Sequence, residues 1–189
     1  MADSVPISMT GEETPSRKLD RKLLSTMSSD ELIDLLFAQM RMLWTVDGFY
    51  YMGIEEQFGT EAATAIDART WRSLGKLECR KLREVTGLKG DDMGTFQRLL
   101  RLTSWALDLE DKEFERKGDV LILRNVKCRV QSTRTSKGLP EFGCRAVREG
   151  YLQAFTTEFS PRYRMNCKVC PPGRHPEGVW CEWEFVRGD

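Results

Sequence analysis

Four cysteines in the C-terminal half constrain the fold of this chain more than any other feature of its sequence. They follow the spacing Cys-x22-Cys-x2-Cys-x10-Cys, as Cys144, Cys167, Cys170 and Cys181. A Cys-x2-Cys pair on a turn can direct both sulfur atoms to one metal ion, and four thiolates form the closed tetrahedral set that zinc prefers. The spacing therefore predicts a structural Zn²⁺ site that holds the C-terminal half together.

Two other interpretations of these cysteines stay open. Four thiolates can also hold an iron–sulfur cluster, which would make the chain a redox protein. Alternatively, the cysteines are small buried apolar residues. The remaining two, Cys79 in an expected helix and Cys128 in an expected strand, are interpreted as core residues. The single histidine, His175, is expected to be a solvated loop residue, because four sulfur atoms already complete a tetrahedron.

The composition limits the cellular compartment and the binding partners that we expect for this chain. The 189 residues include 29 basic and 29 acidic ones, so the net charge gives no attraction toward nucleic acid or an acidic membrane surface. The N-terminus lacks the apolar run of a secretory signal, and no stretch is apolar over the ~18 residues that a membrane span needs. We expect a cytoplasmic protein with reduced cysteines. Its expected partners are a small organic ligand and, as one option, a second copy in a homodimer, with no nucleic acid and no membrane.

The hydrophobic pattern divides the chain into a leader and two regions of one compact domain. Residues 1–18 are rich in Ser, Thr, Pro and charge, which predicts a disordered leader. Residues 19–110 show apolar side chains at helical spacing. The expected helices there cover residues 28–59, 60–87 and 91–108.

From residue 111 to 189 the pattern changes to the alternation typical of strands. It predicts strand segments between Phe114 and Val130, with a hairpin at Gly118 and a bend at Asn125. A helix over 143–159 and two final strands around a Pro-rich loop are expected next. The fold class is therefore α+β: N-terminal helices packed on a small antiparallel sheet, with a metal-stapled C-terminal helix–hairpin unit.

The segments Cys144-Arg-Ala-Val-Arg-Glu-Gly150-Tyr-Leu and Cys181-Glu-Trp-Glu-Phe185 carry a family resemblance. They resemble the C-terminal half of the 4-vinyl reductase domain family, which consists of small-molecule-binding domains. Its metal-binding members use three cysteines and one acid. Cys144, Cys170 and Cys181 match the cysteines, whereas Cys167 stands where the acid would be, and the turn before Cys181 is longer than expected. The resemblance covers about residues 119–189 and implies a ligand-binding domain with four metal ligands.

The N-terminal helices carry a second resemblance. Trp44-Thr-Val-Asp47-Gly-Phe-Tyr-Tyr51 and Glu55-Glu56-Gln-Phe-Gly59 are similar to segments of cytosolic proteins of anaerobic microbes, some of them labelled L-2-amino-thiazoline-4-carboxylic acid hydrolase-like. A shared fold does not transfer chemistry. This resemblance supports only an alternative function, that of a hydrolase or lyase acting on a small heterocyclic or carboxylated compound.

Polar residues of the first expected helix are the first candidates for a ligand site. Asp47 lies at the edge of the apolar stripe, and Tyr51 and Glu55 continue its face. An acid beside a core needs a partner or a function. Either these residues orient a polar ligand or transfer protons, or they belong to a solvated helix face.

Two arginines and three tryptophans are the second candidates. Arg129 and Arg134 flank a short polar stretch, and an expected strand places Gln131 on the same face as Arg129. Arginine suits a two-pronged contact with a carboxylate. The sequence predicts a small apolar or aromatic carboxylate bound between helices and sheet, with apolar walls from Trp44, Trp71 and Trp105. Alternatively, the tryptophans only fill the core and the arginines face water.

The sequence shows no common nucleophile or phosphate-binding motif. If the chain is an enzyme, the candidate catalytic residues are therefore Asp47 with Glu55, or Cys128 with Arg129.

Overall fold

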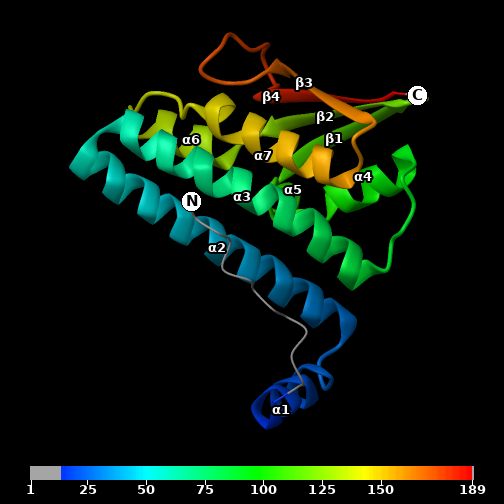
Figure 1. Cartoon of the computed structure of the whole chain (residues 1–189). Helices are drawn as coiled ribbons and strands as arrows, with labels where there is room; N and C mark the ends of the chain where they lie inside the picture. Colours follow the sequence, from blue (N-terminus) through cyan, green and yellow to red (C-terminus); the bar gives the residue numbers. More distant parts are fainter. Residues whose placement is uncertain (1–13, 189) are drawn as a thin grey trace.

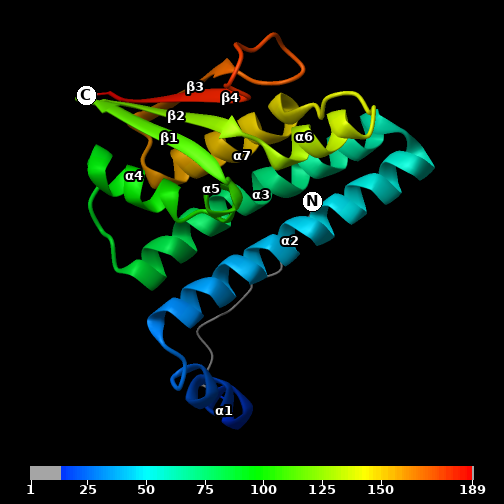
Figure 2. The same cartoon turned by 180° about the vertical axis from the view of Figure 1, so that it is seen from behind.

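The structure is a computed structural model that describes residues 14–188. Four antiparallel strands form one sheet in the order β1-β2-β4-β3, and the helices lie on one side of it (Figures 1 and 2). The strands are β1 (Asp111–Lys117), β2 (Val120–Lys127), β3 (Tyr163–Val169) and β4 (Cys181–Arg187). The helices are α1 (Pro15–Leu24), α2 (Ser29–Phe58), α3 (Thr60–Thr86), α4 (Met93–Arg101), α5 (Ser104–Asp108), α6 (Arg129–Ser136) and α7 (Cys144–Phe159). The predicted α+β class is confirmed.

The core lies between the sheet and the α3–α7 layer, and α2 lies on the far side of that layer (Figure 1). Gly75 of α3 allows the two helices to approach closely, because a Cβ atom there would lie 2.4 Å from the carbonyl oxygen of Tyr151 on α7. Aromatic side chains from α4, α7, β4 and, through Tyr163, β3 fill the space under the sheet. They include Phe96, Tyr151, Phe155, Trp183 and Phe185, all of them completely buried.

Local signals place the ends of the two long helices where the sequence predicts them. Ser28 and Glu31 form a capping box: the Glu31 amide donates to the Ser28 hydroxyl at 3.2 Å, and the Ser28 amide donates to the Glu31 carboxylate at 2.7 Å. Gly59 ends α2 with φ +85° and Gly87 ends α3 with φ +68°, conformations that disfavour a side chain.

The predicted hairpin and the predicted helix over 143–159 are also confirmed. Gly118 has φ +58° and joins β1 to β2. The helix α7 begins at Cys144 and ends at Phe159. The strand β4 pairs with β2 on one side and β3 on the other, so the last strand of the chain lies inside the sheet.

The prediction of a strand that continues to Val130 is wrong, and so is the predicted bend at Asn125. The strand β2 runs without a break to Lys127, and Asn125 pairs with Cys181 in its register. Because Cys181 is the first residue of β4, the sheet offers the chain no further β4 partner beyond that point. A helix, α6, then satisfies the backbone hydrogen bonds of the next residues.

Two further boundaries differ from the prediction. The helix predicted over 91–108 is divided into α4 and α5, because the Thr103 hydroxyl accepts the Ala106 amide at 3.1 Å and starts a new helix. The predicted leader, residues 1–18, lies mostly outside the described residues. Its last part is helical: Thr14 caps α1, and Pro15 occupies the first helical turn.

Among residues 14–188, no helix combines the length and the apolar character that crossing a membrane requires.

Candidate functional site

A cleft of about 250 Å³ lies between α2, α3, α6 and α7. It is larger than the engineered apolar cavity of ~150 Å³ that binds benzene. The α2 wall contains most of the side chains that the sequence singled out, and α6, the loop after it and α7 form the opposite wall. The residues central to its chemistry are Trp44, Asp47, Tyr51, Asp67, Arg129, Arg134, Phe142 and Arg148.

Arg148 of α7 is the buried cation of this cleft. Its side chain is only 5% exposed, and its guanidinium carbon lies 4.2 Å from the ring centroid of Trp71 and 4.6 Å from that of Trp44. The two indole rings stack on each other at 4.5 Å. The Nη1 atom is buried and has no hydrogen-bond partner within the described part of the chain. An unpaired buried donor on a charged group is costly. The Nη1 atom of Arg148 is therefore a place where an acceptor from a ligand would be favourable.

Two acids stand near Arg148 on the other wall. The Trp71 indole N–H donates to Asp47 of α2 at 3.2 Å, and Asp67 of α3 is buried beside it. Burial raises the pKa of Asp47, and the positive charge of Arg148 opposes this rise. Burial raises the pKa of Asp67 to about 6, with repulsion from Asp47 as the second cause. Asp67 therefore changes its protonation state just below neutral pH.

Arg134, a predicted ligand residue, already has acceptors within the chain. It lies on α6, not on a strand, and its Nη1 and Nη2 atoms donate to Glu55 at 3.1 and 3.3 Å. Its Nε atom donates to the carbonyl oxygen of Pro140 at 2.8 Å. Hydrogen bonding from Arg134 lowers the pKa of Glu55. The pair therefore links α2 to α6 and leaves Glu55 as an ionised partner of Arg134.

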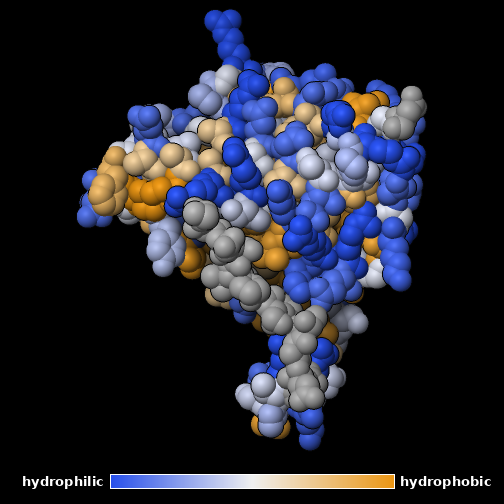
Figure 3. All heavy atoms as spheres, in the orientation of Figure 1, coloured by the Kyte–Doolittle hydropathy of each residue, from blue (hydrophilic) through white to orange (hydrophobic). Residues whose placement is uncertain are grey.

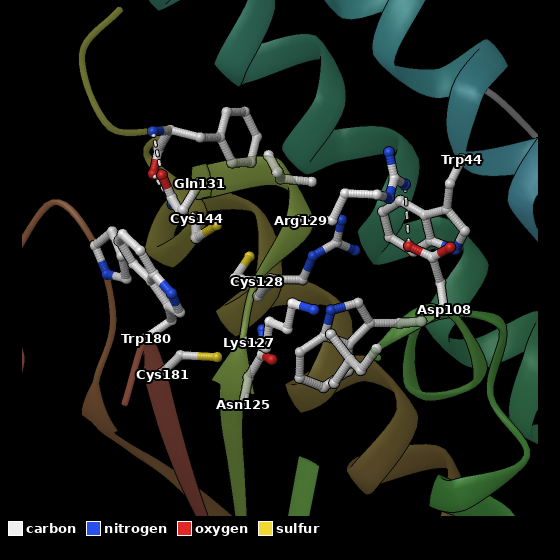
Figure 4. A pocket seen from close by; sticks show the side chains of 16 residues that line it. Trp44, Asp108, Asn125, Lys127, Cys128, Arg129, Gln131, Cys144, Trp180 and Cys181 are labelled. Atoms are coloured by element: carbon white, nitrogen blue, oxygen red, sulfur yellow. Dashed lines mark hydrogen bonds and ion pairs between the residues drawn. The ribbon is translucent and has the colours of Figure 1, made fainter. Parts of the chain in front are cut away.

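Arg129 also lies on α6 and points toward Asp108, at the end of α5 (Figure 4). Its Nη2 atom donates to Asp108 at 3.1 Å, while its Nε atom is buried without a partner among the described residues. The strand face that the sequence predicted for Arg129 and Gln131 does not exist. Gln131 is completely buried and exchanges two hydrogen bonds of 2.9 Å with the backbone of Phe142, so it fixes the loop before α7.

The predicted aromatic residues surround this region. Trp44 and Tyr51 line the cleft, and Trp105 lines a smaller neighbouring cavity of about 40 Å³. The Trp44 indole donates to the carbonyl oxygen of Ser104 at 3.1 Å, and the Tyr51 hydroxyl contacts the Thr64 hydroxyl at 3.0 Å. These bonds fix the rings as walls of the cleft, with their polar atoms already satisfied.

Sequence reasoning missed Arg148 and Asp67. A signal for Arg148 was present, since Val147, Tyr151 and Phe155 predict the buried face of the helix and Arg148 falls inside it. Asp67 gave a weaker signal, one turn before Trp71 on the apolar side of α3. Neither residue belongs to a recognisable motif.

Cys128, Cys144 and Cys181 line the small cavity (Figure 4), and Cys170 contacts Cys144. A hydrogen bond from Cys170 lowers the pKa of Cys144, and Gln131 donates to the Cys144 sulfur at 3.2 Å. The same Cys144–Cys170 contact and burial raise the pKa of Cys170. Burial raises the pKa of Cys181 and of Cys128.

The fourth predicted metal ligand, Cys167, interacts with this group through Cys170. Cys167 is half-buried on β3 and interacts with Arg145 and Glu149 of α7 as well as with Cys170. Between residues 14 and 188, no three side chains of Cys, His, Asp or Glu are arranged to hold a metal ion. The predicted zinc site and its iron–sulfur alternative therefore stay predictions.

Cys79, predicted to be a core residue, is completely buried in α3. Burial raises the pKa of this thiol to about 11. It stands on the α3–α7 side of the core.

Residues 25–187 match the model of a family of unknown function, DUF6125. No curated protein and no solved structure matches the chain.

Proposed function

The chain belongs to the family DUF6125, and we propose that it binds a small organic carboxylate in the cleft between α2, α3, α6 and α7. In this proposal the domain is a sensor, carrier or accessory module, as its resemblance to the 4-vinyl reductase domains implies. Arg148 holds the carboxylate, and the aromatic walls hold an apolar body.

The observation that carries the proposal is the state of Arg148. A buried guanidinium with an unpartnered Nη1 atom is expensive unless something accepts its hydrogen bond. A ligand carboxylate supplies negative charge and acceptor oxygens together, and arginine binds such a group through two N–H donors. Contact with Trp44 and Trp71 fixes the guanidinium in place before a ligand arrives.

The distribution of charge in the cleft also supports a polar ligand of limited size. Arg129 and Arg134 have carboxylate partners, Asp108 and Glu55, so their charges are largely offset. Among the described residues, Arg148 keeps an unpartnered Nη1 atom and Arg129 an unpartnered Nε atom, and Arg148 is the more deeply buried of the two.

A second candidate function is that of a hydrolase or lyase acting on a small heterocyclic or carboxylated compound. The observation that favours it is Asp67, because a buried acid with a pKa of about 6 can accept or release a proton near neutral pH. Asp67 takes the place of Glu55 in this hypothesis, since Glu55 is bound by Arg134. Cys128 is a poor nucleophile candidate because burial raises the pKa of its thiol.

Titration calorimetry with benzoate and phenylacetate, and with benzamide as the uncharged counterpart, tests the binding function. We expect the carboxylates to bind and benzamide not to bind. The variant Arg148→Met keeps the bulk of the side chain and removes the charge, and we expect it to weaken carboxylate binding at least ~30-fold, corresponding to about 2 kcal/mol for a charge-assisted contact.

The matched control is Arg145→Met on the same helix, whose exposed side chain pairs with Glu149 outside the cleft. Arg145→Met should bind like the wild type. Equal binding by the wild type and Arg148→Met refutes the role of Arg148. If the wild type converts a ring compound and Asp67→Asn does not, the result favours the hydrolase or lyase function.

A further inference from the structure

The long helix α2 exposes an apolar stripe to solvent. Leu36, Leu43 and Tyr50 recur every seven residues, and all three are exposed. Leu32 and Val46 are also exposed, and Gln39 stands seven residues from each of them, so 32, 39 and 46 form a second seven-residue series. This is the spacing with which one helix packs along another in a coiled coil. Only Trp44 and Tyr51 of α2 are buried in the single chain.

The stripe is not the face that α2 uses against its own chain. Trp44 and Tyr51 point toward α3, α5 and the loop before α7, as their contacts with Trp71, Ser104 and Phe142 show. Around the helix, Val46 lies on the side opposite to these residues. In Figure 3, hydrophobic residues reach the surface along the edge where α2 runs in Figure 1.

The exposed apolar area is large enough for a stable interface. Met42 and Phe49 flank the stripe, Phe49 is 65% exposed and Tyr50 is 71% exposed. Taking ~200 Å² for a whole aromatic side chain, the stripe and its flanks expose roughly 700 Å² of apolar surface. A single-chain protein seldom shows a patch above ~600 Å², whereas a specific dimer buries ~800 Å² on each partner.

The surface beside the stripe is shaped to receive a helix. Between α2 and α3 runs an apolar groove of about 310 Å³. Leu43, Val46 and Tyr50 form one of its sides, and the exposed Ile66 of α3 belongs to the other. A stripe and a groove on the same face are self-complementary, which is what a two-fold symmetric interface requires.

From this geometry we infer that α2 is the dimer interface of the protein and that the occupant of its apolar face is α2 of a second copy. The stripe of each copy packs along the stripe and groove of the other. The inference does not depend on the ligand proposed above, because Leu43, Val46 and Tyr50 lie outside the carboxylate cleft, whereas the flanking Phe49 lines it.

Sedimentation equilibrium of the full chain tests this. The wild type should have a mass of about twice the 21.8 kDa of one chain. The variant Val46→Glu places a charge at the centre of the stripe, and we expect roughly a hundredfold weaker self-association, since an unpaired charge in an interface costs several kcal/mol.

Val85→Glu is the matched control. Val85 is 78% exposed near the end of α3 and does not line the groove. Val46 is 49% exposed, so neither change opens the core. Val85→Glu should remain dimeric, and circular dichroism should give the same helix content for both variants. A monomeric wild type at 100 µM overturns the inference, and so does a dimeric Val46→Glu. A monomer that binds anionic lipid vesicles through this face would assign it to a membrane surface and overturn it equally.

Discussion

Replacing Asp67 by Asn should stabilise the protein near neutral pH and remove part of its pH dependence. Asp67 has an ordinary pKa of 3.8 that is raised to about 6 in the folded chain, first by burial and then by repulsion from Asp47. Arg148 and the Trp71 indole oppose the rise. The folded state thus binds the Asp67 proton more tightly than the unfolded state does.

The sign and the magnitude follow from linkage. A raised carboxyl pKa gives stability that is fully present below pH ~4 and is lost as the pH rises through ~6. A shift of about two units corresponds to about 3 kcal/mol of unfolding free energy, as an upper limit. Because the amide of Asn carries no charge at any of these pH values, Asp67→Asn should avoid this loss and gain up to ~3 kcal/mol at pH 7.5.

Urea unfolding between pH 4 and 8 measures the effect. The difference in unfolding free energy between Asp67→Asn and the wild type should grow between pH 4 and 6.5 and then stay constant. In the Asp47→Asn variant, the pH-dependent loss of stability caused by Asp67 should occur at lower pH, because the repulsion that raises the pKa of Asp67 is removed. Asp20→Asn, on the exposed helix α1, is the control and should leave the curve unchanged. A difference that does not vary with pH, or a loss of stability at pH 7.5, would refute the reasoning.

Two further predictions concern packing and metal content. Gly75→Ala should destabilise the protein by about 3 kcal/mol in urea unfolding, because its Cβ atom would collide with the Tyr151 carbonyl. The control Gly48→Ala, whose Cβ atom meets nothing within 4 Å, should gain ~0.5–1 kcal/mol. Equal stability of the two variants would contradict the close α3–α7 packing. Elemental analysis of protein purified without chelator tests the zinc prediction. About one zinc per chain is expected, Cys170→Ala should lose it and Cys79→Ala should keep it, and a metal-free wild type would refute the site.

The sequence alone determined the long helices and the fold class. Helix ends depend on residues that are close in the chain, such as the pair Ser28 and Glu31 and the glycines at 59 and 87. The same holds for the hairpin at Gly118. These signals can be recognised without tertiary structure because their interactions span only a few residues.

The segment after β2 shows where local pattern fails. Val126, Cys128 and Val130 alternate with polar residues as a strand would, yet the chain forms α6 from Arg129 onward. The pairing partner decides this, since β4 begins at Cys181 opposite Asn125. A pattern of five residues cannot reveal where a strand ~55 positions later begins.

Only the tertiary structure decided which arginine of the cleft can hold an anion. Arg129, Arg134 and Arg148 are equally charged in the sequence. Glu55, 79 positions before Arg134, binds its guanidinium, and Asp108 binds Arg129. Arg148 is left with an unpartnered Nη1 atom beside two stacked indole rings. The physical reason is that the free energy of a buried charge depends on its neighbours in space, and the fold brings those neighbours from distant helices.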